Sequence, residues 1–223
     1  MSIRSYLSIC LYAVSAALAS CGSRYCIDGS ADLYGYDGKQ LSAVVYDGSR
    51  FVSVDSCEVR HGRFSMEGLI DSVRFAVLCC DSRPVLPLFL EKGNITVKMS
   101  ASGLDVSGTR QNNLLYEFLA RKKELDNRFE DMFQQRENIA ASRFEADVKK
   151  MVQEAEDYFY NFISSHYEEP VGLSVFVMMC DAQPRDGQMT PLIKRILDSA
   201  PESFLKKKFV RNYISRCGYP SVD

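Results

Sequence analysis

The chain has 223 residues, of which 46% are hydrophobic and 25% charged, a composition typical of one folded domain or two small ones. Its formal net charge is -2 at pH 7, so it lacks the positive charge that binds nucleic acid through phosphates, and we expect no nucleic-acid partner. With only two histidines, it offers little for metal or acid-base chemistry, and we expect neither a metal nor a cofactor.

Residues 1–20 are predicted to be a signal peptide. A basic residue, Arg4, precedes an apolar run from Tyr6 to Ala19 that has the length of a secretory h-region and is short for a transmembrane helix. The run ends in Leu-Ala-Ser-Cys, which resembles the lipobox of bacterial lipoproteins. We therefore expect cleavage before Cys21 and lipid attachment to that cysteine. An ordinary secretory signal with a chance cysteine at its end is the alternative.

The residues after the acylated cysteine direct sorting in such lipoproteins. An Asp directly after the cysteine would indicate retention in the inner membrane, and an acidic cluster would indicate transfer to the cell surface. Gly22 to Tyr25 contain neither signal. We therefore expect the protein to be tethered in the cell envelope at the periplasmic face of the outer membrane. Several acyl chains would make this anchoring effectively permanent.

Residues 21–108 are predicted to form a β-rich module. Short apolar or alternating runs are separated by glycine and Asp/Asn turns at a spacing of about 8 to 12 residues, which is typical of an antiparallel sandwich-like or open-barrel fold. The predicted strands are Tyr25–Gly29, Leu41–Tyr46, Phe51–Cys57, Arg63–Glu67, Val73–Cys80, Pro87–Glu91, Asn94–Met99 and Leu104–Ser107.

Residues 109–223 are predicted to be helical, which gives an α+β fold class. The hydrophobic period changes from two to 3.6 after Gly108, and two long stripes predict an antiparallel helix pair. Ser142 and Glu145 have capping-box spacing at the start of the second helix; a helix start a few residues earlier is the alternative. The first stripe is Leu114, Phe118, Leu125, Phe129 and Met132; the second is Phe144, Val148, Met151, Val152, Ala155, Phe159, Phe162 and Ile163.

Three further helical segments follow. Pro170 introduces an apolar stretch, Val171 to Cys180, that we interpret as a buried helix. Thr190-Pro191 places a capping residue before proline at the first helical position. A single last helix is predicted from one apolar stripe of Phe204, Phe209, Val210, Tyr213 and Ile214.

Several motifs resemble a bacterial module, the domain of unknown function 4369. Its "DS..V..G.F.F.G" hairpin is similar to the segment from Asp55 to Gly68, and its "LE.G.I.V" hairpin to the segment from Leu90 to Val97. Its "V.GT..N" junction between strand and helix is similar to the segment from Val106 to Asn112. In that family the module usually belongs to a lipoprotein and leads into a thioredoxin-like disulfide reductase domain.

The reductase chemistry of that family is not expected in this chain. A thioredoxin site needs a low-pKa thiolate and a resolving thiol in a Cys-x-x-Cys motif, which is absent here. Cys79 and Cys80 are adjacent, but neighbouring strand residues point to opposite faces, so we expect both to pack as small apolar residues. The sequence leaves open whether a disulfide bond joins any two of the remaining four cysteines, and which two. They are Cys26, Cys57, Cys180 and Cys217.

Other polar constellations favour structural or surface roles. His61 and His166 are expected in a turn and at a helix end. The basic run Lys206–Lys208 is interpreted as a solvated helix face, with contact to lipid headgroups as the alternative. Tyr34 and Tyr36, in an early glycine-rich turn, are the candidate exposed contact residues.

We therefore expect a non-enzymatic, membrane-tethered interaction lipoprotein that acts through an unknown protein partner. Two alternatives stay open: an accessory protein to a separate thioredoxin-like disulfide reductase, and a carrier of a glycan or hydrophobic ligand. Of single positions, only Cys21 is assigned a role, as the lipidation site.

Overall fold

A computed structural model describes residues 23–138, 140–183 and 188–218. The first part is a set of eight strands. They are β1 (Ser23–Asp32), β2 (Gln40–Tyr46), β3 (Phe51–Glu58), β4 (Arg63–Ile70), β5 (Arg74–Cys80), β6 (Arg83–Leu90), β7 (Gly93–Ser100) and β8 (Gly103–Ser107). The predicted signal peptide and Cys21 lie outside the described residues.

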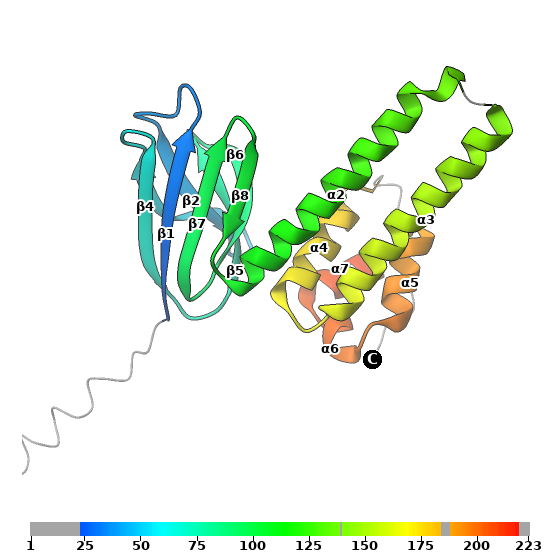
Figure 1. The fold of residues 1–223 in the computed structure, drawn as a ribbon. Coiled ribbons are helices and arrows are strands. Elements are labelled where there is room, and N and C mark those ends of the chain that lie inside the picture. Colours follow the sequence, from blue (N-terminus) through cyan, green and yellow to red (C-terminus); the bar gives the residue numbers. More distant parts are fainter. Residues whose placement is uncertain (1–22, 139, 184–187, 219–223) are drawn as a thin grey trace, which may run out of the picture.

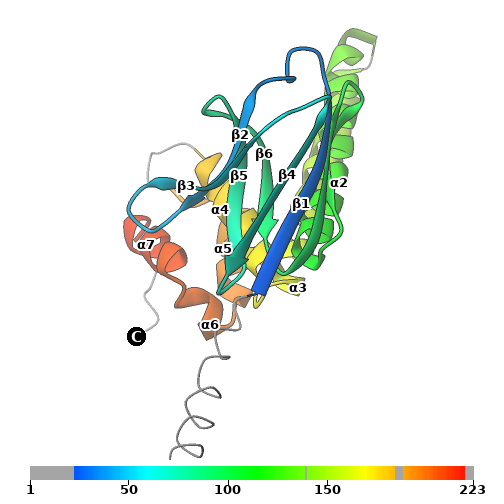
Figure 2. The same cartoon turned by 90° about the vertical axis from the view of Figure 1, so that its left-hand side faces the viewer.

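The strands form two four-stranded sheets that face each other (Figures 1 and 2). One has the order β4-β1-β7-β8 and the other β3-β2-β5-β6. All pairs are antiparallel except β1 and β7, which run parallel with Tyr25 opposite Gly93. The fold is thus a sandwich-like, open β module within an α+β chain, and the parallel pair is the one departure from the predicted antiparallel arrangement.

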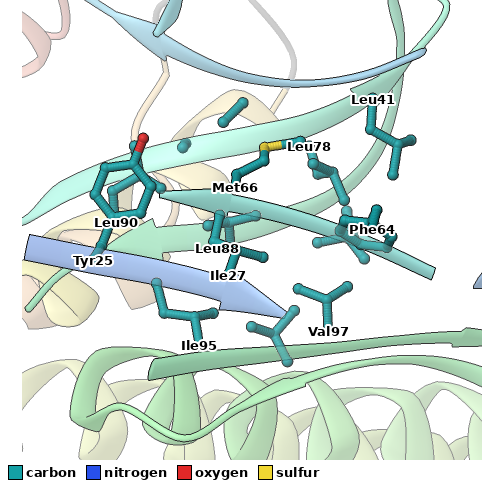
Figure 3. Packing of buried hydrophobic residues seen from close by; sticks show 14 of the residues in the cluster. Tyr25, Ile27, Leu41, Phe64, Met66, Leu78, Leu88, Leu90, Ile95 and Val97 are labelled. Carbon is teal, nitrogen blue, oxygen red and sulfur yellow. The ribbon is translucent and has the colours of Figure 1, made fainter. Parts of the chain in front are cut away.

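The sandwich core lies between the sheets. Alternate residues of each strand are buried, because successive side chains of a strand point to opposite faces. Figure 3 shows Ile27 on β1 and Ile95 on β7 close to Leu88 of the opposite sheet. The remaining fully buried side chains of this core include Leu41, Leu78, Leu86, Leu90, Val97, Met99 and Val106.

All eight predicted strands are present, with different ends. β6 begins four residues before the predicted Pro87, so it contains both Pro84 and Pro87. Proline has no N–H to donate to a ladder and is tolerated on an edge strand. β6 is such an edge, because it pairs only with β5.

Helices make up the rest of the described chain. They are α2 (Arg110–Gln134), the 3-10 turn η1 (Arg136–Asn138), α3 (Ala141–Ser165), α4 (Pro170–Asp181), α5 (Pro191–Ser199), α6 (Glu202–Leu205) and α7 (Lys208–Arg216). The antiparallel pair α2–α3, the buried helix α4 and the Thr190 cap are confirmed, and the Thr190 hydroxyl accepts from the N–H of Ile193.

One helix prediction was wrong, and one open alternative is decided by the structure. The last helix is two helices, since Lys207 is extended between α6 and α7. On a straight helix Phe204 and Val210 would lie about 120° apart, and the break allows both to be fully buried in one core. α3 begins before Ser142, at Ala141, which is the earlier start that the sequence left open, so Ser142 and Glu145 form no capping box and the helix has no side-chain cap. Its first turn is exposed, so water can satisfy the free N–H groups.

The helical core packs against one face of the sandwich. Phe75 of β5 and Phe89 of β6 point to the outer face of their sheet and contact each other with ring centroids 5.4 Å apart. Both belong to the cluster formed by the helices, which also contains Phe118, Phe176 and Phe204. Sheet and helices therefore share one hydrophobic interface.

A buried polar network, which we call the polar joint, fixes that interface. It consists of Glu91 after β6, Gln111 and Asn112 in the first turn of α2, and Glu169 before α4. The Asn112 amide accepts from the Phe89 N–H at 2.8 Å and donates to the Phe89 carbonyl at 2.8 Å. Asn112 thus pairs with an edge strand as a neighbouring strand would.

The joint also caps two helices. One carboxylate oxygen of Glu91 accepts from the N–H groups of Gln111 (2.7 Å) and Asn112 (3.2 Å), at the positive N-terminus of α2. The Gln111 side chain accepts from Val171 N–H in the first turn of α4 and donates to Glu169. Arg110 forms a two-point ion pair with Glu169 and is the main cause of the lowered pKa of that carboxyl.

Loss of the Asn112 amide should destabilise the protein. Asn112→Ala leaves the buried N–H and carbonyl of Phe89 without partners, which costs about 1–3 kcal/mol for each unsatisfied group. Urea unfolding should show the loss as a lower midpoint. Asn127→Ala, on the exposed face of the same helix, is the matched control and should change the free energy of unfolding by less than about 0.5 kcal/mol. Equal effects of the two substitutions would contradict the role of the joint.

Candidate functional site

The start of β1 defines one end of the molecule, which we call the tether end. Cys21, the predicted lipidation site, stands two positions before Ser23, the first residue of β1. The register places Ser23 opposite Ile70, at the start of the β4–β5 turn. The β2–β3 turn and the polar joint lie at the same end of the strands, while the β1–β2 loop and the β5–β6 and β7–β8 turns lie at the opposite end.

The motif residues around Asp55 close the edge of the sandwich. Asp55 lies on β3 opposite the inward-facing Ala43, and its carboxylate accepts from the Tyr25 hydroxyl at 3.0 Å. Burial, followed by this hydrogen bond, raises the pKa of Tyr25. Gly68 lies opposite Tyr25, and a Cβ there would come within 2.8 Å of the ring. These residues thus link the two sheets.

The other motif residues surround the polar joint. Gly108 has φ +100°, and a Cβ there would lie 2.4 Å from the Asn94 carbonyl oxygen, so only glycine fits between β8 and α2. Thr109 is buried, and its hydroxyl accepts from the Asn112 amide. Sequence reasoning singled out these positions as motif residues but did not identify their shared role in the joint.

The six cysteines of the described chain are all free thiols. Cys79 and Cys80 point to opposite faces of β5, and Cys80 packs against the sandwich core while Cys79 is buried on the outer side. Burial raises the pKa of both thiols. Cys180 and Cys217 lie in the helical core beside Tyr213, and burial raises the pKa of Cys180 to about 12.

Neither histidine is placed for metal or acid-base chemistry in the described part of the chain. His61 lies in the β3–β4 turn with φ 51°. His166 follows α3, where its Nδ1 is 2.6 Å from the Phe162 carbonyl oxygen. Within the described residues, no group of three His, Cys, Asp or Glu side chains is arranged to hold a metal ion.

A cavity opens at the end of the sandwich that is opposite the tether end. We call it the loop-end cavity; its volume is about 690 Å³, within the usual size of ligand pockets. The β1–β2 loop, the β5–β6 turn and the β7–β8 turn form its walls. Its lining includes Leu33, Tyr36, Val85 and Leu104 as apolar residues and Lys39 and Arg83 as cations.

Of the two tyrosines of the early turn, Tyr36 lines this cavity and Tyr34 does not. Tyr36 is half-buried and packs against the sandwich core, whereas Tyr34 is fully exposed. Lys39 donates to Asp81 at 2.7 Å, and this hydrogen bond lowers the pKa of the Asp81 carboxyl. Because Lys39 is paired with Asp81, Arg83 supplies the positive charge at the mouth of the cavity. The arrangement suits a ligand with an apolar or sugar-like body and an anionic group.

The α2–α3 hairpin projects beyond the other helices (Figure 1). Ion pairs join the two helices in the middle of the hairpin. The Glu154 carboxylate of α3 accepts hydrogen bonds from Arg121 (2.8 Å) and Arg128 (2.7 Å) of α2. Further out, Phe133 stacks on Phe129 at 5.6 Å and meets Phe144 edge-on at 5.3 Å. We call these three residues the hairpin tip.

The distal apolar stripe is less buried than its sequence pattern predicted. Val152 of the predicted second stripe is 40% exposed, and Phe133, which lies outside the predicted stripes, is 47% exposed. Phe129 and Phe144 are half-buried, although their spacing predicted a covered face. Large apolar side chains that cluster on a protruding element are typical of protein-binding surfaces.

The comparison with known families agrees with the motif resemblance. Residues 25–115 match the family model described as "Domain of unknown function (DUF4369)". The matched segment contains nearly all of the sandwich and the first residues of α2, including Asn112. The rest of α2 and helices α3–α7 lie beyond the match. No curated protein matches the chain. Among the described residues, no helix is long and apolar enough to cross a membrane.

The Cys180 thiol should be chemically inert in the folded protein. With a pKa of about 12, only a very small fraction is thiolate at pH 8, and the thiolate is the reactive form. Alkylation followed by peptide mass spectrometry should find Cys180 unmodified in buffer and modified in urea. Modification of Cys180 at equal rates in both conditions would contradict its burial beside Tyr213.

Proposed function

We propose, from the premise that residues 25–115 form a DUF4369 module, that this protein is a lipoprotein tethered through Cys21 and acts by binding a protein partner. It carries out no catalysis of its own. Its place is the cell envelope, at the periplasmic face of the outer membrane.

The tether is supported by the sequence before the sheet. A basic residue, an apolar run and Leu-Ala-Ser-Cys stand in the order that lipid attachment requires, and the sheet starts two residues after the cysteine. A folded module that begins so close to the lipid remains next to the membrane. A protein partner then binds to surfaces that face away from the tether end.

The hairpin tip is the observation that carries the proposed partner binding. Its three aromatic rings lie far from the sheet start, on two helices that project past the other helices (Figure 1). Aromatic side chains at the centre of an interface supply most of its binding free energy. The ion pairs of Glu154 hold the two helices together, so the tip is presented as a preformed surface.

The loop-end cavity supports a second candidate, a ligand carrier. Its volume and its mixture of Tyr36, Leu33 and Arg83 suit a small glycan or an apolar molecule with an anionic group. In this case Tyr36, in the cavity lining, would contact the ligand. The hairpin tip would then take no part.

The mature protein should begin at Cys21 with lipid attached. Mass spectrometry of the protein extracted from its native membrane should find residues 1–20 absent and acyl chains on the first residue. Cys21→Ser should stay a precursor or leave the membrane fraction. An unmodified mature N-terminus at any other residue would exclude the tether.

The hairpin tip should be required for partner capture. We expect Phe133→Ser to weaken binding by about 2 kcal/mol, roughly 30-fold, because an exposed aromatic anchor is lost. Phe133 is half exposed, so the free energy of unfolding should change little. The measurement is chemical cross-linking of the tethered protein in its native membrane, followed by identification of the partner by mass.

Tyr34→Ser is the matched control in the β1–β2 loop. If it abolishes cross-linking while Phe133→Ser does not, the partner binds the sandwich loops and the role of the hairpin tip is wrong. If neither variant changes what is captured, the interaction proposal fails. A disulfide reductase among the partners would identify the function as accessory to that enzyme.

A further inference from the structure

We propose that the tether end rests directly on the bilayer surface, with Leu69 and Val73 at the apolar interface and Lys207 and Lys208 on lipid phosphates. The inference rests on the proposed tether and adds an orientation to it. Its partner is a lipid surface that carries negative charge.

The β4–β5 turn presents apolar side chains beside the start of β1. Leu69 is 67% exposed, and the register places it directly opposite Arg24. Val73, on the other side of the turn, is 39% exposed. Paired strands are only about 5 Å apart, so these side chains lie next to the point where the chain leaves the sheet.

The chain before β1 is too short to hold this end away from the lipid. Two residue steps separate Cys21 from Ser23, and a fully extended chain spans at most about 3.6 Å per residue. The first residues of the sheet therefore lie within about 7 Å of the acylated cysteine. Only side chains at the tether end can then reach the bilayer.

The basic run lies at the same end of the molecule. Figures 1 and 2 both place α6 at the end where β1 starts, and Lys206, Lys207 and Lys208 lie at the break between α6 and α7. Lys206 is paired with Glu202. Among the described residues, Lys207 and Lys208 have no carboxylate partner, which leaves them available to lipid phosphates.

The sheet contributes both signs of charge. Arg24 forms an ion pair with Glu67, and the positive charge of Arg74 attracts the carboxylate of Asp47. Asp71 lies in the β4–β5 turn. These groups roughly balance, so the unpaired lysines supply the positive charge of this face. Each Lys or Arg near an anionic membrane surface contributes attraction that salt screens. The combination of exposed apolar side chains and unpaired cations matches a lipid interface better than a protein surface.

The test uses a tryptophan reporter, because the chain contains no tryptophan. The lipidated full protein carrying Leu69→Trp is reconstituted in vesicles of phosphatidylcholine and phosphatidylglycerol whose acyl chains carry bromine, a contact quencher. We expect a blue-shifted emission maximum and loss of fluorescence compared with unbrominated vesicles. The matched control is Phe133→Trp at the hairpin tip, where we expect no loss.

The charge contribution is tested in the same assay. Replacing Lys207 and Lys208 by glutamine in the Leu69→Trp protein should reduce quenching in these vesicles and leave it unchanged in vesicles of phosphatidylcholine alone. Flotation with the vesicles is scored for every variant. Protein that fails to float contradicts the tether itself. Protein that floats while the Leu69→Trp emission stays unquenched overturns the orientation and leaves the tether itself intact.

Discussion

The polar joint is the interaction on which the arrangement of the whole molecule depends. A carboxylate from the sheet, Glu91, caps α2, and Gln111 in that first turn of α2 caps α4. Asn112 meanwhile pairs with the backbone of the edge strand. Each of these polar groups is buried, so leaving any of them without its partner would cost more free energy than the pairing itself contributes. The joint therefore specifies one orientation of the helices on the sandwich, and the shared core around Phe89 stabilises it.

A fixed orientation gives the molecule two opposed ends. The tether end holds the start of β1, the exposed β4–β5 turn and the lysines beside α6. The loop-end cavity lies at the far end of the sandwich, and the hairpin tip projects in the same general direction (Figure 1). In the account we propose, lipid fixes one end and the other two surfaces are presented to whatever is bound. The motif residues of the matched family serve this framework: Asp55 and Gly68 close the sheets, and Gly108 and Asn112 form the joint.

Sequence patterns predicted the strands well, because alternation and turn glycines are local signals. They could not reveal the joint, since Asn112 contacts Phe89 and Gln111 contacts Val171, and no short-range pattern encodes such distant pairs. Periodicity identified the apolar face of α2 and α3 but not whether anything covers it, so the exposure of Val152, a member of the predicted second stripe, was missed. The break at Lys207 was missed for a related reason. It allows both Phe204 and Val210 to be buried in the helical core, and this burial depends on tertiary packing that local sequence does not encode.

The central claim is that one rigid body stands on the membrane by its tether end. Neutron reflectometry of the lipidated protein on a supported anionic bilayer measures this directly as a density profile along the membrane normal. The account predicts a dense protein layer that begins at the headgroups, without an intervening water layer, and becomes thinner outward where only the sandwich and the α2–α3 hairpin extend beyond the other helices (Figures 1 and 2). A water-filled gap between headgroups and protein, or a diffuse profile from many orientations, would contradict it.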